Sequence, residues 1–152
     1  MFEFSISPAG QLLCNQLLQN LLQASIGKAV IFLSGPATGV PHYQERFKYI
    51  KDQLYRNGFD FHEYYIINPM ELYDGIDDRS VTYIDKLNIG YKIIETLVDA
   101  IVVDDNNEEA LRNSRGCMVE LTQAYNSRIP IMYVSELFPN NKDFEESGEK
   151  DG

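Results

Sequence analysis

The residues best suited to chemistry lie between Ser114 and Glu120, just after a pair of aspartates. Ser114 has the side chain of a helix N-cap, and Gly116 leaves room for a ligand beside the first free N–H groups of a helix. Such N–H groups favour anions, so this helix start is a candidate phosphate seat. Glu120 falls in the second helical turn and adds a carboxylate. This order of groups suits holding a nucleotide while a carboxylate attacks its sugar.

Glu120 and Cys117, the two reactive side chains of this stretch, can each also have a purely structural role. Glu120 can also be a solvated carboxylate on a helix. Cys117 has the chemistry of a nucleophile, but His42 and His62, which could activate it, are distant in sequence, so a packed cysteine is the favoured interpretation. Cys14 and Cys117 have no metal-ligand spacing and form no disulfide framework. We therefore expect two thiols, with no metal and no cofactor.

Composition limits the class of protein. The chain has 152 residues, of which 44% are hydrophobic and 24% charged, as is typical of one globular domain with a sizeable core. Its formal net charge of -10 argues against binding a nucleic acid polymer, which needs a basic face, but allows a single nucleotide. No apolar run approaches the ~20 residues of a membrane span, and no secretory signal is recognisable. A cytoplasmic protein without a membrane partner is expected.

Helical and strand patterns alternate along the chain and would position these groups. Strands are predicted at 29–33, 61–67, 98–103 and 129–134, and helices at 43–57, 80–97 and 114–126. This alternation predicts an α/β domain with a parallel sheet and right-handed crossovers. Ligands of such sheets bind beyond the carboxyl ends of the strands. Those ends should therefore meet in one cleft, and they are Ser34-Gly35-Pro36, Asn68-Pro69, Asp104-Asp105 and the helix start at Ser114.

Both ends of the chain are expected to lie outside this domain. Ser7-Pro8 is a strong helix start, and the helix predicted to about Ala24 carries six leucines from Leu12 to Leu22 and no charged residue. This helix either packs on its own domain or forms the interface of a homo-oligomer. From Glu136 onward the composition is acidic and polar, which predicts a flexible tail. The predicted division is a helical extension at 1–28, the α/β domain at 29–135 and the tail at 136–152.

Three motifs occur together in a recognisable order. They are Ser34-Gly35-Pro36-Ala37-Thr38-Gly39, then Ile67-Asn68-Pro69, then the run from Asp99 to Val103 followed by Ser114 to Glu120. Their combination resembles the nucleoside 2-deoxyribosyltransferase-like superfamily, and most closely its small uncharacterised bacterial and phage branch with a Ser-Gly-Pro-x-Thr-Gly loop. The resemblance covers residues 29–134. It implies a flavodoxin/Rossmann-like parallel sheet of four to five strands flanked by helices, to which this chain adds an N-terminal helix.

The same resemblance implies chemistry at an N-glycosidic bond. Glu120 would be the nucleophile on the anomeric carbon, and either Asp104 or Asp105 would be the acid that helps the base to leave. The transferases usually carry a Tyr near the end of the first strand, where this chain has Ser34. The residues that the resemblance and the strand ends place around the substrate are Ser34, Gly35, Pro36, Tyr43, Asn68, Ser114 and Gly116.

Three functions are compatible with the sequence. The first is cleavage or transfer of the N-glycosidic bond of a nucleoside or nucleotide, with hydrolysis of a nucleoside monophosphate as the favoured variant. The second is binding of a nucleotide or nucleotide-derived signal without turnover, as a sensor or sponge. The third is an interaction module built on the leucine-rich helix. Members of the superfamily are commonly oligomers, which adds to the expectation of a homo-oligomer.

Overall fold

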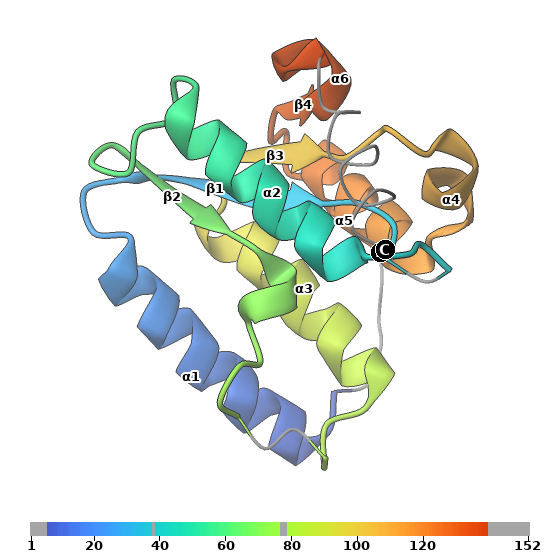
Figure 1. Ribbon diagram of the computed structural model, residues 1–152. Coiled ribbons are helices and arrows are strands. Elements are labelled where there is room, and N and C mark those ends of the chain that lie inside the picture. The colour runs from blue at the N-terminus through green and yellow to red at the C-terminus, as the bar shows by residue number, and fades with distance from the viewer. Residues whose placement is uncertain (1–5, 38, 77–78, 140–152) are drawn as a thin grey trace.

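A four-stranded parallel sheet forms the centre of the molecule (Figure 1). The computed structural model describes residues 6–37, 39–76 and 79–139. The strands are β1 (Ala29–Ser34), β2 (Tyr64–Ile67), β3 (Ala100–Val103) and β4 (Ile131–Tyr133). Their order is β2-β1-β3-β4, and every pairing is parallel. The predicted flavodoxin/Rossmann-like α/β fold is therefore confirmed.

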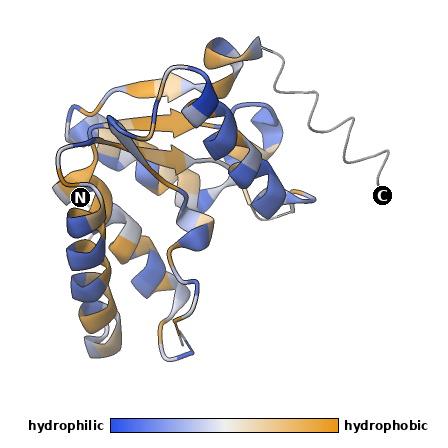
Figure 2. Cartoon of the chain, turned by 60° about the vertical axis from the view of Figure 1, so that its left-hand side comes forward, coloured by the Kyte–Doolittle hydropathy of each residue, from blue (hydrophilic) through white to orange (hydrophobic). Residues whose placement is uncertain are grey.

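Helices cover both faces of this sheet. They are α1 (Pro8–Ala24), α2 (Tyr43–Arg56), the 3₁₀ turn η1 (Pro69–Glu71), α3 (Tyr83–Leu97), α4 (Glu108–Asn113), α5 (Arg115–Asn126) and α6 (Val134–Leu137). Val30 and Phe32 of β1 point into a core with α1, α3 and α5, whereas Ile31 and Leu33 point into a core with α2. Burial on both faces explains why the strands are apolar throughout, and Figure 2 shows them in orange at the centre. Among the described residues, no helix is long and apolar enough to cross a membrane.

A hydrogen-bonded node joins the starts of α1 and α3. Asp85 forms a capping box with Thr82, and it also accepts hydrogen bonds from the Ser7 N–H at 2.8 Å and the Ser7 hydroxyl at 2.6 Å. These bonds, led by the one from the Ser7 hydroxyl, lower the pKa of Asp85. A Cβ atom at Gly10 would lie only 2.7 Å from Asp85 Cγ. A glycine is therefore what allows α1 and α3 to approach at this crossing.

The leucine-rich helix α1 packs on its own domain. Leu13, Leu17 and Leu21 are buried, and α1 belongs to the same core as β1 and β3. Leu12 and Leu22 do not share this buried face and are 72% and 52% exposed. The structure thus shows that α1 packs on its own domain. A homo-oligomer interface formed by the exposed leucines stays a prediction.

Two short helices lie outside the segments that were predicted to be helical. The acidic stretch after Asp105 contains α4, which is capped by the Asn107 side chain through the Ala110 N–H. Residues 134–137 form α6, and Leu137 and Phe138 pack against the core on the α2 face. The polar tail predicted from residue 136 therefore does not begin there, because these two side chains hold the chain on the core. Its remainder, residues 140–152, lies outside the described residues.

Candidate functional site

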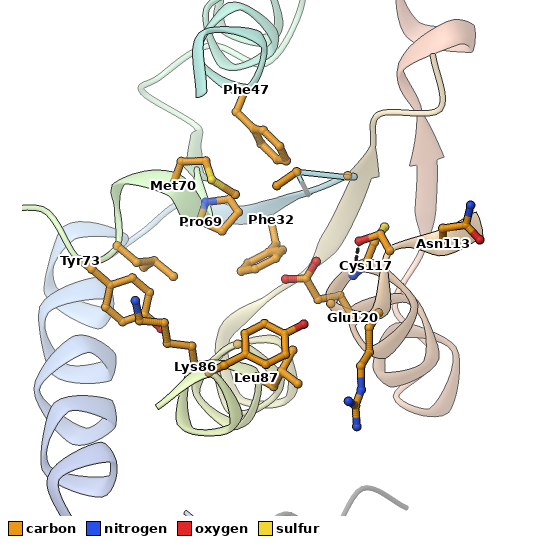
Figure 3. Close-up of a pocket in the computed structure, with 18 residues that line it drawn as sticks. Phe32, Phe47, Pro69, Met70, Tyr73, Lys86, Leu87, Asn113, Cys117 and Glu120 are labelled. Carbon is orange, nitrogen blue, oxygen red and sulfur yellow. Dashed lines mark hydrogen bonds between the residues drawn. The ribbon is translucent and has the colours of Figure 1, made fainter. Parts of the chain in front are cut away.

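A cleft of about 420 Å³ opens beyond the carboxyl end of β1, between the turn η1 and the helices α3 and α5 (Figure 3). Its floor and one wall are apolar and include Phe32, Pro69 and Met70. Glu120 projects into it from α5. The position agrees with the rule that ligands of parallel sheets bind beyond the strand ends.

The two oxygens of the Glu120 carboxylate have different surroundings. Oε1 accepts a hydrogen bond of 2.7 Å from the Ser34 hydroxyl at the end of β1. Oε2 faces α3 at Gly90, where an added Cβ atom would lie 3.8 Å away, so no α3 side chain covers this oxygen at that position. Burial raises the pKa of Glu120 to about 7, and the bond from Ser34 partly opposes this rise. One oxygen is therefore held while the other faces the cleft.

Cys117 lies behind this carboxylate as a packed thiol. It is buried, and its Sγ atom is 3.1 Å from Ser34 Oγ. Because Ser34 has one hydroxyl proton and donates it to Glu120, its oxygen is left to accept from the thiol. Burial raises the pKa of Cys117 to about 12. A thiol with so high a pKa is almost entirely protonated near neutral pH and is a poor nucleophile. This favours the interpretation of Cys117 as a packed cysteine.

The start of α5 forms the second wall of the cleft. Ser114, Arg115 and Gly116 line it, and the Ser114 hydroxyl caps the helix by accepting the Cys117 N–H at 3.2 Å. A Cβ atom at Gly116 would meet Leu87 at 3.8 Å, which is ordinary contact. The fold thus does not require glycine at position 116. Its absent side chain leaves space for an anion beside the start of α5.

The charge around the cleft differs from that of the whole chain. Among the described residues that line it, the charged side chains are Lys86, Arg115 and Glu120. Two cations and one carboxylate give an excess of positive charge, although the chain carries a formal net charge of -10. Such a local excess attracts an anionic ligand into an otherwise acidic protein.

Comparison with known proteins gives a family for this arrangement. Residues 29–133 match the family described as a domain of unknown function, DUF4406. The chain belongs to the DUF4406 family. No curated protein and no solved structure matches it. The DUF4406 span contains all four strands and every described residue that lines the cleft, whereas α1 lies before it.

The structure brings part of the predicted site of this DUF4406 protein together. Glu120, Gly35, Ser114 and Gly116 line the cleft, and Ser34 reaches Glu120 through its hydroxyl. Gly35 also has a structural reason to be glycine, since an added Cβ atom would lie only 3.0 Å from the Cβ atom of Asp104. The strand ends therefore meet at the helix start, as the alternating pattern predicts.

Other predicted residues do not line the cleft of the DUF4406 domain. Asp104 is buried and binds Arg46 of α2 through both oxygens, at 2.9 Å to Nε and 3.0 Å to Nη2. Asp105 accepts hydrogen bonds from the backbone and hydroxyl of Ser135. Neither aspartate therefore stands where an acid for the leaving base is needed.

Three further predicted contacts also lie elsewhere. Asn68 is buried and caps η1 by accepting the Met70 N–H at 3.0 Å. Tyr43 lies in a separate hollow formed with Ala37, Gly39, Val40 and Pro41. Pro36 is buried and is not among the residues that line the cleft. These positions shape the loops around the DUF4406 cleft without facing it.

Sequence reasoning missed the contribution of α3. Tyr83, Lys86, Leu87 and Gly90 line the cleft from one face of this helix, at spacings of three, four and seven residues. Lys86 Nζ lies 4.7 Å from the centroid of the Tyr73 ring, which also lines the cleft. Two features of the sequence could have indicated this face of α3. One is Gly90 inside a predicted helix, and the other is the helical spacing of Tyr83, Lys86 and Leu87.

Proposed function

We propose that this protein cleaves or transfers the N-glycosidic bond of a nucleoside or nucleotide, with Glu120 as the nucleophile. The observation that carries this proposal is the asymmetric Glu120 carboxylate, with Oε1 held by Ser34 and Oε2 facing the cleft. A carboxylate with a pKa of about 7 is substantially ionised at neutral pH, yet it is poorly solvated. Poor solvation favours attack on carbon. The resemblance to the nucleoside 2-deoxyribosyltransferase-like superfamily supports the same assignment.

The reaction divides into two steps. Ionised Glu120 attacks the anomeric carbon through Oε2, the C–N bond breaks, and its electron pair leaves with the base. A water molecule or a second base then attacks the same carbon and releases the Glu120 carboxylate. In hydrolysis, water supplies the hydroxyl group of the sugar and the proton of the free base. Ser34 keeps the carboxylate oriented throughout.

The start of α5 is proposed to hold the 5′ end of the substrate. Ser114 and Gly116 line the cleft next to Arg115, and helix N–H groups bind phosphate without a basic surface. The positive excess around the cleft favours a substrate with a phosphate, so a nucleoside monophosphate is the favoured variant. A volume of about 420 Å³ lies in the range of small-molecule sites, about 300–1,000 Å³.

Binding without turnover is a second candidate, favoured by one observation. Glu120 is the only carboxylate among the described residues that line the cleft, because Asp104 is bound to Arg46. Glycosidases commonly use two carboxylates, one of which protonates the leaving group. A cleft with one carboxylate is compatible with a protein that holds a nucleotide or nucleotide-derived signal unchanged.

Release of free base distinguishes these functions. Purified protein is incubated with nucleosides, deoxynucleosides, their 5′-monophosphates and NAD, and the free base is measured by chromatography. Wild type and the Glu63→Gln control, which changes an exposed carboxylate, should release base, whereas Glu120→Gln should lose about 10³-fold or more. A sugar adduct on Glu120, detected by mass spectrometry, would support a covalent intermediate. Activity that survives in Glu120→Ala would refute the nucleophile assignment, and tight binding of an unchanged ligand in calorimetry would support the binding function.

A further inference from the structure

The proposed reaction needs a group that stabilises the departing base, and neither aspartate is placed for this work. Asp104 is bound to Arg46, and Asp105 is bound to Ser135. Glu120 cannot serve, since it forms the new bond to the sugar. The group must therefore come from another wall of the cleft.

Lys86 stands on the wall opposite the start of α5. Figure 3 shows Lys86 and Tyr73 on one side of the cleft and Cys117 and Asn113 on the other, with Glu120 reaching in between them. Lys86 Nζ lies over the Tyr73 ring, 4.7 Å from its centroid. A cation–π contact of this kind restrains the ammonium group at the edge of the cleft.

The walls of the cleft follow the three parts of a nucleotide. The helix start at Gly116 suits the 5′ end, and Glu120 lies where the sugar carbon would react. The Lys86 side of the cleft also carries Pro69 and Met70, which offer the apolar surface that a planar base packs against. A base seated there would bring its polar edge to the Lys86 ammonium group.

We propose that Lys86 binds a carbonyl oxygen of the leaving base, and that the cleft selects bases in which this oxygen is conjugated with the glycosidic nitrogen. Uracil, thymine and hypoxanthine belong to this class, whereas adenine does not. The inference rests on the proposed function, since it assigns the leaving-group half of the same reaction.

Charge and atoms balance in this step. As Glu120 bonds to the anomeric carbon, the electron pair of the broken C–N bond goes to the base, and the negative charge spreads onto its carbonyl oxygen. The Lys86 ammonium group donates a hydrogen bond to that oxygen and keeps its own proton. The departed base is later protonated at nitrogen by the water that hydrolyses the sugar ester of Glu120.

The test compares leaving groups that need assistance with one that does not. The substrates are uridine 5′-monophosphate, adenosine 5′-monophosphate and the 4-nitrophenyl glycoside of the same ribose phosphate, whose leaving group is a stable anion. The variants are Lys86→Met, Lys86→Arg and Glu120→Gln. The matched control is Lys92→Met, which removes an exposed lysine of the same helix whose ion pair with Glu95 spans 3.5 Å. Thermal melting checks that each variant is folded.

Wild type should cleave the uridine nucleotide faster than the adenosine nucleotide. Lys86→Met should lose about 10²–10³-fold in kcat on the uridine nucleotide but less than about threefold on the nitrophenyl glycoside. Lys86→Arg should stay within about tenfold of wild type, because a guanidinium group also donates to a carbonyl oxygen. The Lys92→Met control should resemble wild type on every substrate.

Several results would overturn the assignment of Lys86. Equal losses on the natural and the nitrophenyl substrates would mean that Lys86 only supports the fold, through Tyr73. Unchanged rates in Lys86→Met, or preference for the adenosine nucleotide, would equally refute it. These results would leave the proposed function intact if Glu120→Gln still abolishes cleavage of the nucleotides and of the nitrophenyl glycoside. A wild-type protein that cleaves neither these substrates nor any of the nucleosides, deoxynucleosides, 5′-monophosphates and NAD tested above would refute the proposed function, and the Lys86 assignment with it.

Discussion

Replacing Glu120 by Gln should stabilise the protein at pH 8 and change its stability little at pH 5. Burial raises the pKa of Glu120 from 4.5 to about 7, so the folded chain retains a proton that the unfolded chain releases. Folding stability therefore falls as the pH rises from about 4.5 to about 7, because the folded state binds more protons in this interval. Gln is neutral throughout and keeps an oxygen that accepts the Ser34 hydroxyl.

The size of this effect follows from the two pKa values. A shift of one pKa unit corresponds to about 1.4 kcal/mol. The rise in the pKa of Glu120 from 4.5 to about 7 therefore lowers the free energy of unfolding of the wild type by about 3 kcal/mol at pH 8. At pH 5 the carboxyl group of the folded protein is protonated, and the cost is below about 1 kcal/mol. Glu120→Gln should thus gain about 2–3 kcal/mol at pH 8, which corresponds to about 5–10 °C in Tm for a domain of this size.

Urea denaturation at both pH values measures this gain. Free energies of unfolding are compared for wild type, Glu120→Gln and the exposed control Glu63→Gln, which should show no such dependence on pH. A gain of the same size at pH 5 and pH 8 would mean that the benefit comes from packing and not from charge burial. A loss of stability at pH 8 would refute the raised pKa of the Glu120 carboxyl group.

Three further substitutions test the surroundings of this carboxylate and the packing of α3. In Ser34→Ala the pKa of Glu120 should rise further, because the bond from Ser34 lowers it. Since Glu120 must be ionised to attack, the acid limb of the pH–rate profile should move to higher pH, and an unmoved acid limb would contradict this. Gly90→Ala should raise helix stability by up to about 1 kcal/mol in thermal melting while slowing base release, since its methyl group would lie 3.8 Å from Oε2 of Glu120. Full activity in that variant would show that substrate does not approach Oε2 from this side. Gly10→Ala should destabilise the fold by about 1–3 kcal/mol in urea denaturation, because its methyl group would lie 2.7 Å from Asp85 Cγ, and a neutral result would mean that α1 shifts without cost.

Local patterns were sufficient to predict the fold and one wall of the site. Ser7-Pro8 gives the start of α1 within the sequence itself, and continuous apolar runs such as Ala29–Ser34 are typical of strands buried on both faces. The N-cap Ser114 and the carboxylate Glu120 belong to one helix, so their relative positions follow from helical geometry alone. These features depend on neighbours that are close in sequence.

Contacts between distant segments account for what the sequence did not predict. Asp104, just after β3, is neutralised by Arg46, which lies 58 residues earlier on helix α2. Lys86 meets the cleft only because α3 packs beside α5 with one face toward the strand ends. Such pairings depend on how whole elements cross, and periodicity within one helix does not specify that.

Helix α1 lies outside the residues that match the DUF4406 family, but it is packed into the core of the same domain. Its leucines share the core of the sheet, and Ser7 closes on Asp85 at the start of α3. The same helix α3 carries Lys86 and Gly90 into the cleft. The unit that folds is therefore longer than the unit that sequence comparison recognises. A relative without this helix would have to cover α3 with other residues, and its cleft would rest on a different support.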